Sequence, residues 1–199
     1  MLTPQRREEQ GFASLAQWAS KGAHLLEYEF GFEVGARVTL APAPGWPLVA
    51  VCLACWWSGV TVVFDGSGDL VVAHGDHPVP DGPDVLWIGD AVDGAPVSDA
   101  PGEAWSVAVQ AFPDQPPPAR ARPDVLALQV GDREWSHAQL IATAGSWDQP
   151  GPLGVTADLG RLELIASLAV RPLTTGHPSV LVRGVDVSAA SGEGVTAWA

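Results

Sequence analysis

The sequence predicts an α/β fold with a mostly parallel sheet flanked by helices. Two observations support this fold class. Short apolar segments without charges alternate along the chain with segments whose apolar residues recur at helical spacing. Glycine and proline, 22 and 18 in number, stand at the ends of these segments, where helices and strands stop. With 199 residues, 47% hydrophobic and 17% charged, the chain is long and apolar enough to bury a core.

The first predicted element is an amphipathic helix, because apolar residues recur there at steps of three and four. Its apolar face consists of Phe12, Leu15, Ala19, Ala23, Leu26 and Phe30. Gly31 follows where a C-terminal cap is expected. Residues 36–40 are predicted to form a short strand and residues 48–57 a helix that is apolar on every side and therefore buried. Residues 60–64 are rich in β-branched side chains and are predicted to form the next strand.

Residues 38–64 carry no charge and are long enough to span a bilayer. The competing interpretation is a strand, a buried helix and a second strand. Proline and glycine interrupt the first half of this stretch, and Ser58-Gly59 ends the helix. We therefore favour the α/β core, regard membrane insertion as the lesser alternative, and expect a cytoplasmic location.

The middle of the chain contains fewer predicted elements. Asp65-Gly66-Ser67-Gly68-Asp69 is predicted to be a turn that joins the preceding strand to residues 70–73 in a hairpin. A phosphate cradle is disfavoured there because an acid stands at each end and no basic residue is near. Residues 85–88 are a further strand, and residues 89–123 form a long connection with one short element around residues 107–112.

The second half repeats the alternation. Residues 125–130 are a predicted strand, and Ser136 can cap a helix over residues 137–144. A weak strand over residues 154–157 precedes an amphipathic helix over residues 159–170, which we expect Pro172 to end. Residues 179–183 are a strong strand, and the tail after Gly184 is expected to be loosely held. The predicted organisation is a first half over 1–112, a Pro-rich linker over 113–124 and a second half over 125–199, and the two halves are compatible with one packed domain.

Charge and composition exclude several classes of partner. Ten basic and 23 acidic residues give a net charge of 10 − 23 = −13, which argues against nucleic acid and against an anionic membrane surface. Two cysteines cannot make a disulfide framework. Cys52 and Cys55 form a C-x-x-C inside the apolar helix, where buried structural thiols are favoured over a redox pair or a zinc site.

Two further groups of residues are candidate sites. His74-Gly75-Asp76-His77 could bind a metal weakly, but polar residues are expected in such a loop, and we predict no metal. Among the nine tryptophans, Trp46, Trp56 and Trp57 are predicted to belong to the core. The remaining candidates for an exposed aromatic patch, which would mark a ligand or partner surface, are Trp105, Trp135, Trp147 and Trp198.

Residues 35–63 carry three motifs in a fixed order. Gly35-Ala36-Arg37-Val38 begins a strand, Pro44-Gly45-Trp46-Pro47 makes a turn, and residues 54–63 place a tryptophan pair before glycine and valines. This order resembles the "GDRV", "P-x-x-P/H-W" and "W-x-x-G-x-x-V-V" motifs in the N-terminal region of the AMP-binding, adenylate-forming superfamily, which includes acyl-CoA synthetases. Residues 135–140 and 168–183 resemble its later "T-H-x-N-L" and "L-x-x-P-L-x-x-G-x-x-V-V-L" motifs. The whole pattern is most similar to an actinobacterial family of short AMP-binding-like proteins and implies a truncated N-terminal domain.

The departures from the superfamily concern its chemistry. Its phosphate loop is rich in Ser, Thr and Gly and ends in Pro-Lys, whereas this chain has Gln129-Val130-Gly131-Asp132-Arg133-Glu134 at that place. Its catalytic lysine belongs to a C-terminal domain that lies beyond residue 199, and the one lysine here, Lys21, is on the first helix. The resemblance therefore implies an AMP-binding-like fold without the groups that stabilise the transition state of adenylation.

The favoured interpretation is a non-catalytic relative that acts as a binding or interaction module for a protein partner or a small ligand. The alternative is an enzyme, or a nucleotide- or acyl-ligand-binding protein, with a reduced acyl-CoA synthetase-like pocket. The candidate ligand-binding residues are Arg133, Ser136 and His137, which occupy the position of the phosphate loop, where Arg133 and the helix N-terminus could bind an anion. No catalytic residue and no cofactor is predicted.

Overall fold

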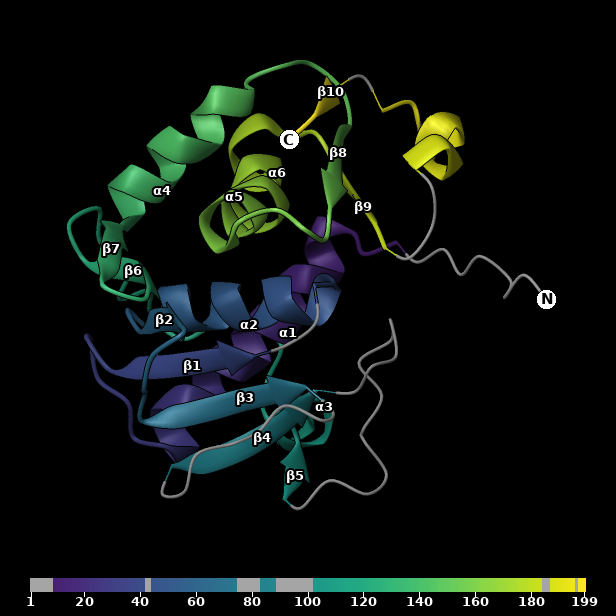
Figure 1. The fold of residues 1–199 in the computed structure, drawn as a ribbon. Coiled ribbons are helices and arrows are strands. Elements are labelled where there is room, and N and C mark those ends of the chain that lie inside the picture. The colour runs from purple at the N-terminus through teal and green to yellow at the C-terminus, as the bar shows by residue number, and fades with distance from the viewer. Residues whose placement is uncertain (1–8, 42–43, 75–82, 89–101, 184–186, 196) are drawn as a thin grey trace.

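The computed structural model describes residues 9–41, 44–74, 83–88, 102–183, 187–195 and 197–199. Within these ranges the larger of two sheets has the strand order β5-β4-β3-β1-β2-β6-β7 (Figure 1). Neighbouring strands are parallel throughout except for β6 and β7, which are antiparallel. The strands are β1 (Arg37–Ala41), β2 (Thr61–Phe64), β3 (Leu70–His74), β4 (Asp84–Ile88), β5 (Glu103–Ala104), β6 (Leu126–Val130) and β7 (Arg133–Ser136). The predicted α/β fold with a mostly parallel sheet is confirmed.

A smaller parallel sheet has the order β10-β8-β9 and lies with α4, α5 and α6 above the larger sheet in Figure 1. Its strands are β8 (Leu153–Thr156), β9 (Ser179–Val182) and β10 (Ala197–Trp198). The tail was expected to be loosely held, but a 3-10 helix over Val187–Glu193 and strand β10 occupy its described part. That expectation was wrong because β10 finds its partner in β8, far away in the sequence.

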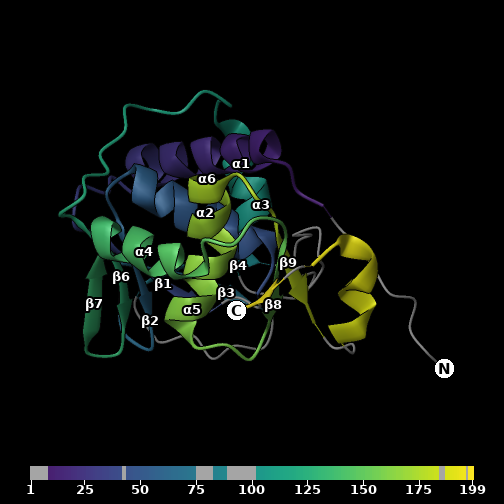
Figure 2. The same cartoon turned by 90° about the horizontal axis from the view of Figure 1, so that it is seen from above.

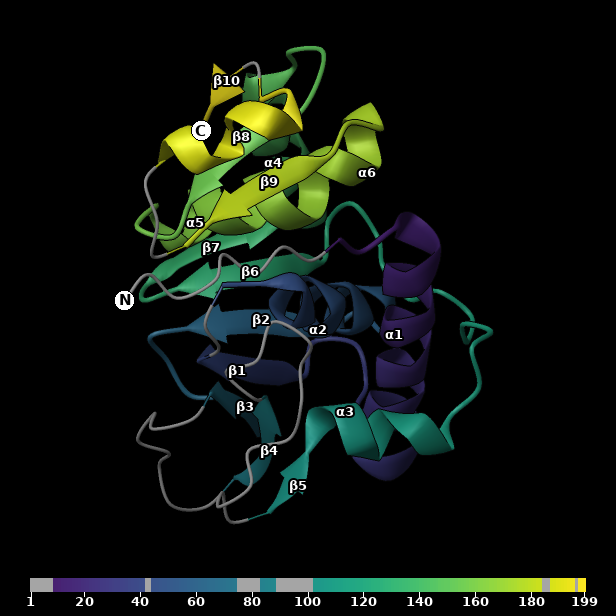
Figure 3. The ribbon, with the colours of Figure 1, turned by 90° about the vertical axis from the view of Figure 1, so that its right-hand side faces the viewer.

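The predicted first helix is confirmed as α1 (Phe12–His24), which continues into a π-helical turn over Leu25–Glu29. Gly31, with a φ of +65°, ends it in the left-handed conformation that glycine adopts without strain. Figure 3 shows α1 and α3 (Trp105–Ala108) on the same side of strands β1–β5. A short 3-10 turn over Val109–Ala111 follows α3.

Helix α2 (Trp46–Trp57) is buried over most of its length, as its apolar sequence predicts. It lies alongside α1 (Figure 2), so closely that a Cβ built on Gly22 of α1 would be 2.7 Å from the Cβ of Ala54. Strand β1, helix α2 and strand β2 therefore account for the uncharged stretch as a strand, a helix and a strand. No helix in the described ranges is both long and apolar enough to cross a membrane.

The connection Asp65–Asp69 does not form the hairpin predicted for it. Strands β2 and β3 both pair with β1, one on each side, and both run parallel to it. The connection must therefore cross β1, and Gly68 passes so close that a Cβ there would be 2.7 Å from the carbonyl oxygen of Arg37. Asp69 holds the crossing in place, since its N–H donates to the Arg37 carbonyl (2.7 Å) and its carboxylate accepts from the Arg37 N–H (2.9 Å). Glycine and aspartate are as suitable for this crossing as for a hairpin turn. The composition of residues 65–69 therefore could not distinguish the two, and the predicted hairpin was wrong.

Pro172 does not end the helix that precedes it. Helix α5 (Arg161–Ile165) widens into a π-helical turn over Ala166–Val170 and continues as α6 (Arg171–Thr175), which ends at the left-handed Gly176. In the wide turn the Arg171 N–H donates to the Ala166 carbonyl, five residues back. Pro172 thus lies where the regular helical hydrogen bonds are already interrupted, so the lack of a proline N–H destabilises the helix only slightly.

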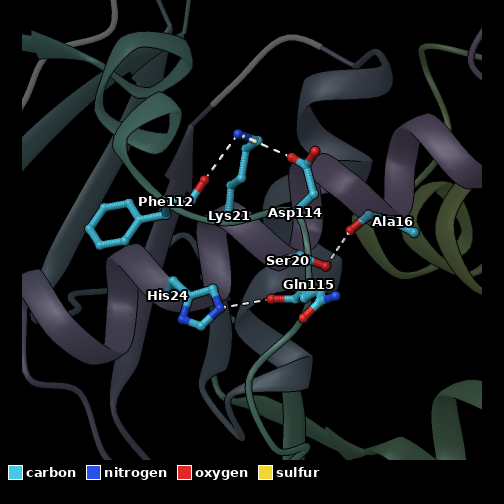
Figure 4. Close-up of polar contacts among 7 residues, drawn as sticks. All are labelled: Ala16, Ser20, Lys21, His24, Phe112, Asp114 and Gln115. Carbon is cyan, nitrogen blue, oxygen red and sulfur yellow. Dashed lines mark hydrogen bonds and ion pairs between the residues drawn. The ribbon is translucent and has the colours of Figure 1, made fainter.

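Residues 112–120, which we call the strap, lie along α1 and the end of α2 and are hydrogen-bonded to both helices. Figure 4 shows the first anchors: Lys21 donates to the Phe112 carbonyl (3.0 Å) and pairs with the Asp114 carboxylate (3.1 Å). The His24 Nε2 lies 2.8 Å from the Gln115 carbonyl oxygen and therefore donates to it. The strap covers most of the predicted Pro-rich linker, and the helices fix the path of its backbone.

The far end of the strap is anchored more firmly. The Trp57 indole donates to the Pro117 carbonyl (2.7 Å), and Pro117 is buried. The Arg120 N–H donates to the Trp57 carbonyl (2.8 Å), and its guanidinium pairs with Glu27 (3.1 Å), whose side chain is only 5% exposed. Beyond the strap the chain returns to the larger sheet, where β6 pairs with β2, so strands from both sides of residues 113–124 share one sheet.

Two of the tryptophan predictions were wrong. Trp57 is 39% exposed, although its indole donates to the strap, and Trp105 is buried at 3% exposure, where it contacts Trp18 (ring centroids 5.4 Å apart). Of the predicted patch, Trp198 is 42% exposed, and Trp135 and Trp147 are partly buried against the core. These four residues therefore do not form one exposed aromatic patch.

Cys52 and Cys55 are free thiols with no exposed surface, as the apolar helix predicts. Burial raises the pKa of both thiols well above the usual range, because a thiolate in the core would lose its hydration. The nearby Cys55 also raises the pKa of Cys52. A raised pKa depletes the thiolate, which is the reactive form, so both residues are structural.

We expect a thiol reagent to label neither cysteine in the native protein at neutral pH. In denaturant, both thiols should react within minutes, because unfolding restores both exposure and the ordinary pKa. The measurement is thiol titration with and without denaturant. Stoichiometric labelling under native conditions, at a rate independent of unfolding, would contradict the placement of α2 in the core.

Candidate functional site

The predicted site residues lie on the β6–β7 hairpin and the helix that follows it. Val130 pairs with Arg133, so the two strands are joined by a tight turn of Gly131 and Asp132 alone. Gly131 has a φ of +55°, a conformation that glycine adopts readily. Its N–H donates to the Phe64 carbonyl (3.1 Å) and its carbonyl accepts from the Gln129 side chain (2.7 Å). The place at which the resemblance puts a phosphate loop is therefore occupied by a closed hairpin.

Ser136 begins helix α4 (His137–Ala144) through a capping box, as its position predicts. Its hydroxyl accepts from the Gln139 N–H (3.4 Å), and the Gln139 side chain accepts from the Ser136 N–H (2.8 Å). The hydroxyl is thereby engaged within the helix. A 3-10 turn over Gly145–Trp147 follows α4.

His137 is half-buried and packs edge-on against Trp56, with ring centroids 6.2 Å apart. Burial lowers the pKa of its imidazole, so the neutral form is favoured at neutral pH. Its Nε2 is buried and has no hydrogen-bond partner in the described part of the chain. These contacts are those of a packing histidine at the start of a helix.

Arg133 lies at the other end of β7 from Ser136 and His137. Three residue steps along the extended strand separate Arg133 from Ser136, which places their backbones about 10 Å apart. The structure brings Ser136 and His137 together at the amino end of β6, where Ser136 pairs with Leu126, and leaves Arg133 at its carboxyl end. Arg133 and the N-terminus of α4 are therefore too far apart to bind the same small anion.

Arg133 has an aromatic platform. Its guanidinium carbon lies 4.9 Å from the ring centroid of Trp135, two residues further along the strand and on the same face. Phe64 at the end of β2 provides a second platform, over which the Arg161 guanidinium carbon lies at 5.3 Å from the centroid. Sequence reasoning missed Arg161, since it is the first residue of an amphipathic helix and no local pattern links it to Phe64.

The other candidate residues stay apart from this edge. Of the His74-Gly75-Asp76-His77 group, only His74 lies within the described residues, and in those residues no cluster of three or more His, Cys, Asp or Glu side chains could hold a metal. A cavity of about 310 Å³ lies between the turn after α1 and strands β4 and β5. Its polar side chains are the carboxylates Glu29, Asp84 and Glu103, which would repel an anionic ligand.

Comparison with solved structures places this fold among acyl-CoA synthetases. An acyl-CoA synthetase from Brucella canis superposes with a TM-score of 0.78 at 19% identity, over 96% of this chain and 42% of its own. A benzoate CoA ligase from Burkholderia xenovorans gives 0.68 at 15% identity, over 92% and 42%. The N-terminal domain of FACL13 from Mycobacterium tuberculosis gives 0.63 at 13% identity, over 87% and 50%.

The chain thus spans less than half of the first two of these structures, and the likeness concerns the fold. No protein-family model matches the sequence, and no curated protein is significantly similar to it in sequence. The structural similarity expected from the motifs, to the N-terminal region of adenylate-forming enzymes, is confirmed.

Proposed function

We propose that this chain is a binding module that uses part of the acyl-CoA synthetase fold and does not adenylate a substrate. The observation that carries this proposal is the two-residue turn between β6 and β7. A phosphate-binding loop needs several free backbone N–H groups or hydroxyls that converge on the phosphates. The turn offers no such array, because the Gly131 N–H is already bonded to Phe64 and the next residue, Asp132, is an acid.

Within these 199 residues, the single lysine does not supply a cation to the β6–β7 turn. In adenylation a cationic group stabilises charge that develops on the transferred phosphoryl group. Lys21 is instead held on α1, by the carbonyl of Phe112 and the carboxylate of Asp114. Its ammonium is neutralised at the strap, and the β6–β7 turn is built on other elements of the sheet.

The candidate partners are a protein or a small ligand. The net charge of −13 disfavours nucleic acid. A small anionic ligand is favoured by one observation: Arg133 and Arg161, which contact Trp135 and Phe64, belong to the region of the sheet where β2 and β6 have their carboxyl ends. In open α/β sheets, ligands bind at that end of the strands.

The purified protein, given ATP, Mg²⁺ and a panel of carboxylic acids, is expected to release no pyrophosphate above background. The physical reason is the absence of a phosphate-binding loop at the β6–β7 turn. The measurement is coupled pyrophosphate detection, with an active acyl-CoA synthetase run in parallel as the positive control. Release that depends on the acid and scales with the amount of protein would overturn the non-catalytic proposal.

A further inference from the structure

Phe64, Val130 and Arg133 form one row across three neighbouring strands. Phe64 pairs with Val130, and Val130 pairs with Arg133. Paired residues of adjacent strands project to the same face of a sheet, so all three side chains lie on one face. The backbones of Phe64 and Arg133 are two strand spacings, about 10 Å, apart. Because Arg161 lies over Phe64, its guanidinium occupies that same face, and Val130 is on the strand between those of Phe64 and Arg133.

Both guanidinium groups are free to bind an acceptor. Within the described part of the chain, neither Arg133 nor Arg161 donates a hydrogen bond or forms an ion pair. Both guanidinium groups contact an aromatic ring, and these contacts leave their N–H groups available as hydrogen-bond donors. The aromatic platforms restrict both side chains, which lowers the entropy lost when a ligand binds. Both side chains are exposed, so water solvates both positive charges when no ligand is bound.

Three nearby acids are turned away from this face or engaged elsewhere, and Asp132, next to Arg133, is exposed. Glu134 pairs with Gln129, and its side chain therefore projects to the opposite face of the sheet. The Thr156 side chain donates a hydrogen bond to the Asp158 carboxylate and lowers its pKa. The Glu163 carboxylate lies against the backbone of Gly160 at the start of α5. None of these three acids forms an ion pair with Arg133 or Arg161 in the described residues.

We propose that Arg133 and Arg161 together bind an organic anion that carries two or more separated phosphate or carboxylate groups. Each guanidinium would take one anionic group through paired N–H donors, and the carbon skeleton of the ligand would lie over Val130 between them. Two cations on one face suit a ligand with two charged ends better than a single small anion. This inference rests on the proposed function, because it names the ligand class of the binding module.

The test is calorimetric titration at low ionic strength with three probes: fructose 1,6-bisphosphate, citrate and inorganic phosphate. We expect the bisphosphate or citrate to bind with a dissociation constant of about 1 mM or tighter, and the stronger of the two identifies phosphate or carboxylate as the preferred group. Inorganic phosphate should bind at least about tenfold more weakly, because it reaches one guanidinium only. Added salt should weaken binding, as it does for exposed charges.

The variants Arg133→Gln and Arg161→Gln should each weaken binding of the preferred probe at least about tenfold. Lysine at either position should restore part of this loss, because it returns the charge without the planar fork. Arg122→Gln is the matched control: it removes the same charge from an exposed arginine in the Pro-rich segment and should change binding less than about twofold. Thermal melts check that each variant remains folded.

Each other outcome overturns the inference. Absence of binding of all three probes, equal binding of phosphate and bisphosphate, or equal effects of Arg122→Gln and Arg161→Gln would exclude a two-arginine site. These results would leave the non-catalytic proposal standing, because that proposal depends on pyrophosphate release alone. Conversely, acid-dependent pyrophosphate release would overturn the proposed function whatever the titrations give.

Discussion

Replacing Arg171 with methionine is expected to lower the free energy of unfolding by about 4 kcal/mol. Arg171 is 1% exposed, and its guanidinium donates to four backbone carbonyls. These belong to Trp147 (2.9 Å), Gln149 (2.9 Å), Gly151 (2.9 Å) and Pro178 (3.2 Å). One side chain thus joins the loop after α4 to the start of β9. Methionine fills a similar volume but leaves these carbonyls without their donor.

Burial lowers the pKa of the Arg171 guanidinium, while the Asp148 carboxylate opposes that shift. An arginine nevertheless stays a cation at neutral pH, so four carbonyl dipoles stabilise a charge that forms no ion pair with a carboxylate of the described residues. Arg171→Lys should lose less stability than the methionine variant, because an ammonium keeps the charge, but it should still be less stable than the wild type because it lacks the planar fork of N–H donors.

The measurement for Arg171 is urea unfolding of the wild type, both Arg171 variants and Arg122→Met. Arg122 is a suitable control, because its side chain is 67% exposed and its ion pair with Asp124 is long (3.7 Å). Its replacement should change stability by less than about 0.5 kcal/mol. If Arg171→Met unfolds within about 1 kcal/mol of the wild type, the four hydrogen bonds do not hold this part of the molecule together.

Gly68→Ala is expected to cost about 2–3 kcal/mol in unfolding free energy. The added Cβ would lie 2.7 Å from the carbonyl oxygen of Arg37, 2.8 Å from the Thr39 nitrogen and 2.9 Å from its hydroxyl. Two of these atoms belong to the backbone of β1, which is fixed between β2 and β3. The strand cannot retreat, so the connection itself must move and lose its hydrogen bonds through Asp69.

Gly145→Ala provides the matched control for Gly68→Ala. Gly145 has a helical backbone (φ −63°, ψ −15°), and nothing lies within 4 Å of a Cβ built there. Alanine should leave stability unchanged or raise it by up to about 1 kcal/mol, because it restricts the unfolded chain. Equal stabilities for the two alanine variants, measured by urea unfolding, would exclude a close crossing of β1 by the β2–β3 connection.

The elements that the sequence predicts well are those whose signal is local. The spacing of Phe12 to Phe30 predicts α1, the uniformly apolar residues 48–57 predict α2, and Ser136 predicts the start of α4. Each depends on residues within a few turns of one another. The fold class follows from the alternation of these segments.

The elements that the sequence predicts poorly are set by the elements next to them and not by their own residues. Residues 133–136 form strand β7 because β6 lies beside them, although Arg-Glu-Trp-Ser has little strand character of its own. The helix passes Pro172 because a π-helical turn precedes it, and no sequence pattern marks that turn. Of the candidate site, Arg133 could be found from its motif position, whereas Arg161 required the contact with Phe64.

The pairing of β6 with β2 also bears on how fast the molecule can fold. Val62 pairs with Leu128, so strands β3, β4 and β5, helix α3 and the strap separate β2 from β6 along the chain. In the larger sheet, the β6–β7 hairpin is the one pairing in the described ranges that a tight turn can form locally. The parallel pairs close longer loops before any contact compensates for the lost chain entropy. Folding should therefore be slow for a chain of this length, limited by the docking of a preformed β6–β7 hairpin onto β2.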